Sequence, residues 1–170
     1  MDLAAERAGL MEIRAATPDD DAALKAVDVA TWSPIVTPGP EPSPETPFFR
    51  PDDDPANYYL VAILDGAVAG YVKLGPPTPL ESNMHVVTIK GLAVDPARQR
   101  RGVARALIEA AAEEASKRGA RRLTLRVLGP NTGAQVLYES CGFEVEGIQR
   151  EEFFLDGQYV DDVLMAKRLA

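Results

Sequence analysis

A strand, a helix and a second strand follow one another in the middle of the chain, and this order constrains the fold more than any other feature. Residues 85–94 are largely apolar and end at Asp95-Pro96, which predicts a strand. Apolar residues recur at helical spacing over residues 100–118, with charged residues on the opposite face. Residues 123–127 alternate between apolar and polar types. Such strands pair in parallel through a right-handed crossover, so the sequence predicts an α/β fold.

Hairpins are predicted on both sides of this segment. Asp65-Gly66 and Asp156-Gly157 each separate two apolar runs, and both dipeptides favour the type I′ turn. A short strand over residues 11–16 and a helix over residues 17–32 come before the first hairpin, and a short helix over residues 131–141 comes before the second. We therefore expect an α/β (α+β) fold with a central mixed sheet of about seven strands, antiparallel at both ends and parallel in the middle, flanked by about four helices.

One segment breaks this regular pattern. Prolines recur through residues 33–55, and each fixes φ and removes an amide donor, so neither a regular helix nor a central strand is expected there. A segment this long without regular structure is usually either functional or mobile. The sequence shows no internal repeat and no second domain, and we expect residues 1–170 to form a single domain that carries this Pro-rich loop.

Charge and cysteine content narrow the range of partners and locations. Acidic residues outnumber basic residues by 26 to 18, and the net charge of −8 disfavours nucleic acid and anionic membranes as partners. The single cysteine, Cys141, cannot form an intramolecular disulfide, which favours a reducing cytoplasm. The first residues lack the basic start and apolar run of a signal peptide, and no apolar stretch approaches the roughly 20 residues that span a bilayer. We expect a soluble cytoplasmic protein.

The connection between the first strand of this unit and its helix is a candidate anion site. It reads Gln-x-x-Gly-x-Ala, with Gln99, Gly102 and Ala104 at the defined positions. Unpaired amides and the positive end of the helix dipole favour an anion there, and small side chains let a phosphate approach the main chain. A pyrophosphate would suit this loop. The alternative is that Gly102 only eases the chain into the helix and the neighbouring arginines are solvated.

Two common nucleotide motifs do not fit this loop, because it has neither Gly-Lys-Ser/Thr nor three glycines. Residues 91–104 instead resemble the coenzyme A motif of the GNAT superfamily of N-acetyltransferases. Residues 131–143, which contain Leu137-Tyr138-Glu139-Ser140-Cys141-Gly142-Phe143, resemble a later part of the same pattern. The order of elements agrees from Met11 to the C-terminus. Ala104 replaces the family's more usual final glycine, a change that the small alanine side chain should allow.

The resemblance implies a GNAT-like sheet splayed at its middle parallel strands, with acetyl-CoA as cosubstrate. Main-chain groups of Leu92 and Val94 would pair with the pantetheine arm, and Asn131 would hydrogen-bond the coenzyme, although asparagine also suits a helix N-cap. The residues that the resemblance implies in cofactor binding are Leu92, Ala93, Val94, Gln99, Arg100, Arg101, Gly102, Val103, Ala104, Arg105, Asn131 and Tyr138.

Tyr138 is implied by the resemblance as the general acid that protonates the departing thiolate. A phenol with an ordinary pKa near 10 stays protonated at neutral pH and can therefore donate a proton. The alternative is a tyrosine that only packs on the sheet. The amide near Val94 resembles the family's oxyanion donor, which polarises the thioester carbonyl.

The general base is not identified by the sequence. Many family members carry a glutamate on the strand before the loop, but residues 86–90 contain no carboxylate. Glu81 and His85 lie just upstream and are the candidate bases, while Glu151, Glu152 or a chain of water molecules are further alternatives. A metal is not expected, because one histidine and one cysteine cannot build the usual nitrogen and sulfur site.

The expected reaction is transfer of an acetyl or other acyl group from its coenzyme A thioester to a primary amine, by direct attack in a ternary complex. The acceptor is left open between a small-molecule amine and the N-terminus of a protein or peptide, entering over residues 32–49 and 76–84. Asp52-Asp53-Asp54 either steers a cationic amine or is a solvated acidic run.

Two further readings follow from the resemblance. The resemblance implies a homodimer through the terminal hairpin. The alternative function is a non-catalytic acyl-CoA-binding sensor or interaction protein, which the missing strand glutamate favours.

Overall fold

Regular structure occupies most of residues 9–169, the part of the chain that the computed structural model describes. The seven strands within this range are β1 (Met11–Ala15), β2 (Tyr59–Leu64), β3 (Ala67–Gly75), β4 (Val86–Val94), β5 (Arg122–Leu128), β6 (Glu144–Leu155) and β7 (Gln158–Arg168). The four α-helices in the same range are α2 (Asp21–Thr31), α3 (Pro55–Tyr58), α4 (Val103–Lys117) and α5 (Thr132–Ser140). Short 3-10 helices are η1 (Pro18–Asp20), η2 (Glu81–Asn83) and η3 (Pro96–Arg98).

The strands form one mixed sheet in the order β1-β2-β3-β4-β5-β7-β6. Strands β4 and β5 are parallel, with Val86 opposite Arg122, and α4 lies between them in the chain. The pairs β1–β2, β2–β3, β5–β7 and β6–β7 are antiparallel. The predicted mixed sheet and its parallel middle are therefore confirmed.

Both predicted hairpin turns are present. Asp65 and Gly66 have φ of 54° and 78°, and Asp156 and Gly157 have φ of 50° and 76°. Two successive residues with positive φ are what a type I′ turn requires, and the twist of this turn matches that of the flanking strands. Local turn chemistry therefore sets the pairing of the residues next to each turn, Leu64 with Ala67 and Leu155 with Gln158.

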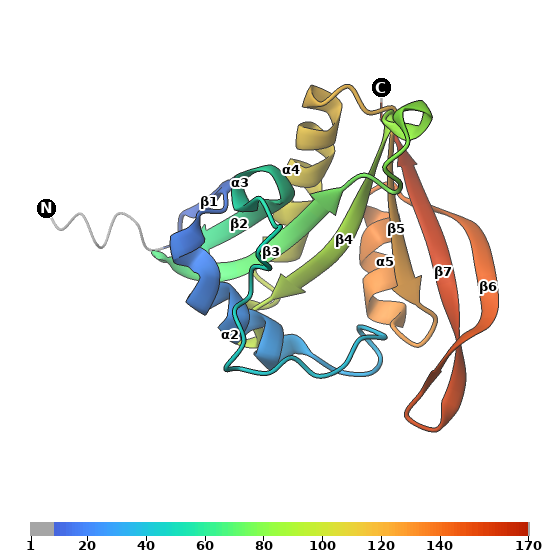
Figure 1. The fold of residues 1–170 in the computed structure, drawn as a ribbon, viewed down its shortest axis with the longest axis horizontal. Helices are drawn as coiled ribbons and strands as arrows, with labels where there is room; N and C mark the ends of the chain where they lie inside the picture. The colour runs from blue at the N-terminus through green and yellow to red at the C-terminus, as the bar shows by residue number, and fades with distance from the viewer. Residues whose placement is uncertain (1–8, 170) are drawn as a thin grey trace, which may run out of the picture. The chain divides into compact units, whose positions relative to one another are not determined.

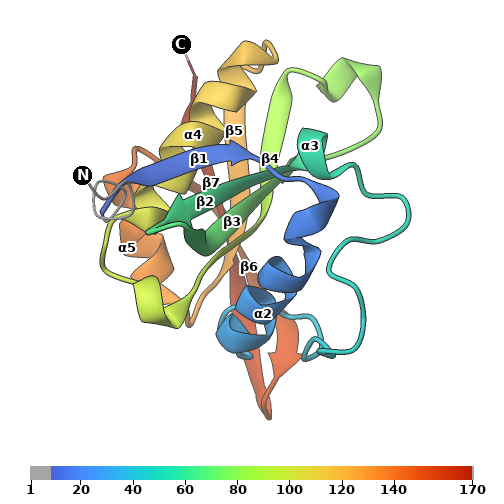
Figure 2. The same ribbon diagram turned by 90° about the vertical axis from the view of Figure 1, so that its left-hand side faces the viewer.

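The chain divides into two compact units, and the first comprises residues up to Thr31, Pro42–Leu74 and Gly91–Ala111. Helix α2 lies on the hairpin of β2 and β3 in this unit (Figure 2). The buried cluster beneath it consists of Ala16, Leu24, Val27, Tyr59, Val61 and Tyr71. Phe48 and Phe49, from the Pro-rich segment, pack against the same cluster. That part of the segment is therefore held by aromatic packing rather than by regular structure.

The second unit comprises Trp32–Glu41, Gly75–Lys90 and Ala112–Ala170. Its β6 and β7 form the long hairpin drawn in orange and red in Figure 1. One face of β5 and β7 is apolar and fully buried through Leu123, Leu125, Val163 and Met165. The β6–β7 pairing shifts register twice, and Glu151, with φ of 50°, lies within the second shift.

One helix boundary differs from the prediction, and two further details of the helices were not predicted. The central helix begins at Val103 rather than near residue 100, because Arg100 and Gly102 have positive φ and cannot continue a helix. The short helix α3 was not predicted. Thr17 does begin the first helical segment, but the carboxylate of Asp20 caps it by accepting the Thr17 amide at 2.8 Å.

Among residues 9–169, no helix is both long and apolar enough to cross a bilayer.

Candidate functional site

In the first unit, the end of β4 is held by β3. The Asp95 amide donates to the Ala69 carbonyl at 2.7 Å, where β4 ends. A Cβ atom at Gly70 would lie 2.4 Å from the Ala93 carbonyl oxygen, closer than any real contact. Only glycine permits this approach, because the obstacle is main chain and cannot swing aside. The strand that carries Leu92, Ala93 and Val94 is thus fixed in place at the point where the loop begins.

The segment from Asp95 to Gln99 is tied together by its own side chains. Asp95 caps η3 by accepting the Ala97 amide at 3.0 Å, and it also pairs with Arg98 at 2.5 Å. The side-chain amide of Gln99 donates back to the Val94 carbonyl at 3.4 Å. The structure thus gives Gln99 a contact with the main chain of the strand, which orients the loop that follows.

The loop itself twice adopts the left-handed conformation. Arg100 has φ of 62° and Gly102 has φ of 80°, and the first bond of the following turn runs from the Ala106 amide to the Gly102 carbonyl at 3.0 Å. Left-handed residues interspersed in a turn direct successive N–H groups into a concavity that suits an anion. The first amides of α4, including those of Val103, Ala104 and Arg105, have no acceptor within the helix. Main-chain donors and the helix dipole therefore converge here.

Gly102 is required for its conformation and not for space. A Cβ atom at this position would meet nothing within 4 Å. Its φ, however, lies in the region that L-residues rarely adopt. A substitution at Gly102 would strain the loop without causing a clash.

Arginine side chains in this segment are partly engaged by the protein's own carboxylates. Arg101 pairs with Asp65 in the β2–β3 turn at 2.8 Å, and Arg98 pairs with Asp95. The Arg101 hydrogen bond holds the pKa of the Asp65 carboxyl below its usual value. Because these two cations already have partners, the anion-binding character of the loop lies mainly in its backbone.

In the second unit, Asn131 forms the N-cap of α5. Its side-chain oxygen accepts the Ala134 amide at 3.3 Å. Gln135 strengthens this helix start, because its side-chain amide donates to the carbonyls of Leu128, Gly129 and Asn131. The capping role of Asn131 is therefore observed, and Gln135 is a supporting residue that sequence reasoning missed.

Tyr138 lies on α5 with only 8% of its surface exposed. Its ring packs edge-on against Phe143, with centroids 5.8 Å apart. Burial raises the pKa of the phenol to about 12, and the neighbouring Cys141 thiol adds to this shift. The hydroxyl has no hydrogen-bond partner among residues 9–169. Tyr138 therefore remains protonated at neutral pH.

The candidate bases lie in different surroundings. Glu81 begins η2 and is exposed, whereas His85 precedes β4 and lines a cavity with arginines. The Glu151 amide donates to Asp161 at 2.9 Å, and Glu152 lies 4.0 Å from Arg126. No group of His, Cys, Asp or Glu side chains in the described range could hold a metal ion.

Two polar arrangements were not expected from the sequence. On β7, the Asp162 side chain is buried, and its carboxylate pairs with Arg126 of β5. Arg126 also donates to the side-chain oxygen of Gln149 at 2.7 Å. The hydroxyl groups of Thr88 and Thr124 hydrogen-bond between β4 and β5. The period-two pattern of β5 predicted which residues share these faces, but not the partners that they meet.

The acidic run Asp52-Asp53-Asp54 is more structural than either expectation allowed. Asp53 pairs with Lys73 at 3.3 Å, accepts the Tyr59 hydroxyl at 3.3 Å, and is only partly exposed. Asp54 caps α3 by accepting the Asn57 amide at 3.4 Å. Of this run, only Asp52 has no such role within the described range.

The loop in the first unit fits the diphosphate of a coenzyme. Its fixed strand end, its two left-handed residues and its exposed helix start together form a cradle of main-chain donors. Arginines in and beside the cradle add positive charge, although Arg98 and Arg101 pair with Asp95 and Asp65.

Several known proteins are similar to this chain. Residues 9–143 match the model of the acetyltransferase (GNAT) family. The chain is 34% identical over 130 residues to the L-amino acid N-acetyltransferase AaaT of Escherichia coli (strain K12), a match that covers 75% of this chain and 78% of that protein. It is 40% identical over 79 residues to the [ribosomal protein bS18]-alanine N-acetyltransferase of the same strain, covering 46% of this chain. This second match spans only about half, 53%, of the relative's own length.

A solved structure shares the fold. The smu.2055 protein from Streptococcus mutans UA159 superposes with a TM-score of 0.79 at 27% identity, covering 94% of this chain and 99% of that one. The family model, the relatives and the shared fold together show that this chain belongs to the GNAT acetyltransferase family.

Proposed function

We propose that this protein transfers an acetyl group from acetyl-CoA to a primary amine. The amine nitrogen forms a bond to the acetyl carbon, the carbon–sulfur bond breaks, and the products are an N-acetylated acceptor and free coenzyme A. The cosubstrate supplies the activated acetyl thioester. The observation that carries the proposal is the main-chain cradle after β4, in which Arg100 and Gly102 have positive φ and α4 begins at Val103.

Binding of the coenzyme is assigned to main-chain groups. The amides of residues 100–105 would hold the diphosphate, and the main chain of Leu92 and Val94 would pair with the pantetheine arm. Support comes from the contacts that fix this strand end, the Asp95 amide on Ala69 and the Gln99 amide on Val94. Asn131 would add a hydrogen bond to the coenzyme besides capping α5.

Tyr138 is assigned as the general acid. Its raised pKa, about 12, keeps the phenol protonated, and its hydroxyl has no other partner in the described range. A proton from this hydroxyl would neutralise the departing thiolate. The amide near Val94 would polarise the carbonyl that is attacked.

The proton released by the attacking amine needs an acceptor. Glu81 and His85 are assigned as candidate bases, because both are exposed and neither has a side-chain hydrogen bond or ion pair within residues 9–169. A base of this kind keeps the amine neutral, which attack on a carbonyl requires.

The acceptor belongs to the class of primary amines, either a small molecule or a protein or peptide N-terminus. One relative is named for an alanine of a ribosomal protein and the other for L-amino acids. An amine carried by an amino acid is therefore the first acceptor to test. A cytoplasmic location is part of the same proposal, supported by a buried single cysteine that forms no disulfide.

The test measures release of free thiol from acetyl-CoA in the presence of a panel of L-amino acids, polyamines and peptides with free N-termini. We expect thiol release that depends on one class of amine, together with a matching mass increase of the acceptor. Coenzyme binding without thiol release across the whole panel would contradict the enzyme assignment and favour the sensor. Absence of coenzyme binding would contradict both.

A further inference from the structure

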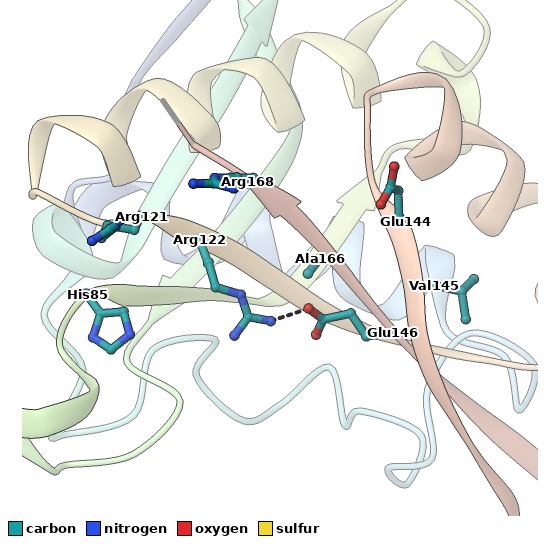
Figure 3. Close-up of a pocket in the computed structure, with 8 residues that line it drawn as sticks. All are labelled: His85, Arg121, Arg122, Glu144, Val145, Glu146, Ala166 and Arg168. Atoms are coloured by element: carbon teal, nitrogen blue, oxygen red, sulfur yellow. Dashed lines mark hydrogen bonds and ion pairs between the residues drawn. The ribbon is translucent and has the colours of Figure 1, made fainter.

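The second unit contains a cavity with a volume of about 470 Å³ at the ends of its strands. Its charged and polar lining comprises His85, Arg121, Arg122, Arg168, Glu144 and Glu146 (Figure 3). Val145 and Ala166 supply the rest of the wall. Three arginines gathered in one cavity are unusual in a chain with a net charge of −8. A volume of this size lies within the range of small-molecule sites.

The strand register brings two of the arginines to the same face. Arg122 of β5 and Arg168 of β7 are direct partners in the antiparallel pairing. Side chains directly opposite each other project to one face of a sheet, and like charges placed there destabilise the pair. A negative charge between or beside these guanidinium groups would relieve that repulsion.

The protein itself satisfies only one of the arginines. Arg122 pairs with Glu146, and both side chains are more than 40% exposed. Arg121 and Arg168 have no side-chain hydrogen bond or ion pair within residues 9–169. In Figure 3 both extend on the side of the cavity where His85 lies, whereas Glu144 stands on the opposite side near Val145.

The main chain holds these residues in place. The Arg121 amide donates to the His85 carbonyl at 2.7 Å, and the Leu169 amide donates to the Arg121 carbonyl at 2.9 Å. These bonds fix the strand ends that carry the arginines before any ligand arrives. A main chain that is already fixed lowers the backbone part of the cost of ordering a site on binding.

We propose that this cavity binds a small molecule that carries carboxylate or phosphate groups. Arg121 and Arg168 are the main anchors, because their guanidinium groups present several N–H donors in a planar fork that matches both kinds of oxyanion. His85 adds a ring N–H donor. Arg122 is already paired with Glu146 and is therefore not a main anchor. The cavity is separate from the coenzyme cradle, because none of its residues belongs to residues 99–105, but it shares His85 with the acyl-transfer proposal, in which His85 is a candidate base.

Isothermal titration with citrate and, separately, with inorganic phosphate tests the proposal. The full chain is titrated alone and again with an excess of coenzyme A, so that binding of the anion to the coenzyme loop would be recognised by its loss in the second titration. We expect one molecule of at least one of the two probes to bind per chain. The preferred probe distinguishes a polycarboxylate ligand from a phosphorylated one.

Variants then locate the binding. Arg121→Gln and Arg168→Gln should each lower the affinity for the preferred probe roughly tenfold, which is the usual effect of losing a hydrogen bond to a charged group. Arg150→Gln is the matched control, since Arg150 is an exposed arginine of β6 outside the cavity, and it should change the affinity less than about twofold. Circular dichroism of each variant checks that it is folded.

Glu146→Gln supplies a test with the opposite sign. It removes one negative charge and frees Arg122, so the probe should bind about threefold more tightly. A variant that merely damaged the cavity would weaken binding instead. The proposal is overturned if neither probe binds, if Arg168→Gln binds as well as the parent, or if Glu146→Gln binds more weakly.

Discussion

The loop of residues 99–105 and the arginine cavity at the strand ends are both suited to anions, but they use different parts of the chain. In the loop, the donors are main-chain amides arranged by two left-handed residues, and Arg101 is already paired with Asp65. In the cavity, the donors are side chains from separate strands, and Arg121 and Arg168 have no partner of their own among residues 9–169. Backbone conformation should therefore control anion affinity at the first site, and side-chain charge should control it at the second. Substitutions can separate the two.

The largest effect is expected at Tyr138, a side chain whose proposed role concerns turnover and not affinity. Tyr138→Phe should lower kcat about 100-fold or more, because it removes the proton donor, while leaving the affinity for acetyl-CoA nearly unchanged. Since the pKa of the phenol is about 12, kcat of the parent should show no decline from tyrosine ionisation up to about pH 10. Steady-state kinetics over pH, with calorimetry for affinity, measures both. Unchanged kcat in the variant would remove Tyr138 from the mechanism.

The next effect concerns loop conformation. Gly102→Val should lower the affinity for acetyl-CoA about 30-fold. A β-branched residue at φ of 80° costs about 2 kcal/mol and moves the amides out of the cradle. Binding of citrate or phosphate in the cavity should be unaffected.

Gly157→Val is the matched control for this change. Gly157 has φ of 76° and, like Gly102, open space where a Cβ would lie, but it belongs to the β6–β7 turn. The two variants should lose similar stability to denaturant, yet only Gly102→Val should lose coenzyme affinity. Equal affinities in the two variants would mean that loop conformation does not govern binding.

A smaller effect is expected when a loop arginine is replaced. Arg101→Gln should change acetyl-CoA affinity less than about threefold, because the Arg101 side chain is directed to Asp65 and the main chain remains. In the cavity, Arg168→Gln should lower the affinity for citrate or phosphate by a clearly larger factor. A loss of tenfold or more in Arg101→Gln would show that side-chain charge dominates in the loop as well.

The smallest effect is expected on the pKa of one carboxyl group, that of Asp65. Arg101 holds the pKa of the Asp65 carboxyl in the folded protein below its usual value. The pair therefore stabilises the folded state at pH values above about 4, the pKa of an aspartate in the unfolded chain. This contribution is lost as the pH falls through the lower pKa that Asp65 has in the folded protein. In Arg101→Gln the Asp65 pKa should move up toward the usual value. Carbon-detected NMR titration of the carboxyl measures this directly, and an unshifted pKa would show that the ion pair is not formed in solution.

The sequence was informative where the structure depends on neighbouring residues. Asp65-Gly66 and Asp156-Gly157 form the predicted turns because their positive φ values are a property of the dipeptides themselves. The parallel pairing of β4 and β5 followed from the order strand, helix, strand. The loop of residues 99–105 could be proposed as an anion site for the same reason, since the features that suggest this role lie in a short run of main chain.

Local signals were also missed. Asp54 followed by Pro55 is an N-cap followed by a proline at the first helical position, and it could have revealed α3. The start of α4 was placed three residues early, since nothing in the residue type of Arg100 indicates its positive φ. Asn131, in contrast, was recognised as an N-cap, and its side chain does accept an amide of α5.

Features that depend on distant residues could not be predicted. The cavity combines Arg122, Glu146 and Arg168 from three strands with His85, which precedes β4, and only the packing of these distant segments brings them together. The pairing of Arg126 with buried Asp162 has the same origin. Hydrophobic periodicity gives the face on which a side chain lies, but it contains no information on the partner across the sheet.

The most direct test of the central claim is a titration of the isotopically labelled protein with acetyl-CoA, followed through the amide signals in ¹H–¹⁵N NMR spectra. If main-chain donors of residues 100–105 hold the diphosphate, their amide signals should show the largest shifts and should shift little when S-acetylpantetheine, which lacks the diphosphate, is added instead. If acetyl-CoA leaves these amides unchanged, or if both compounds shift them equally, the account of this loop is wrong.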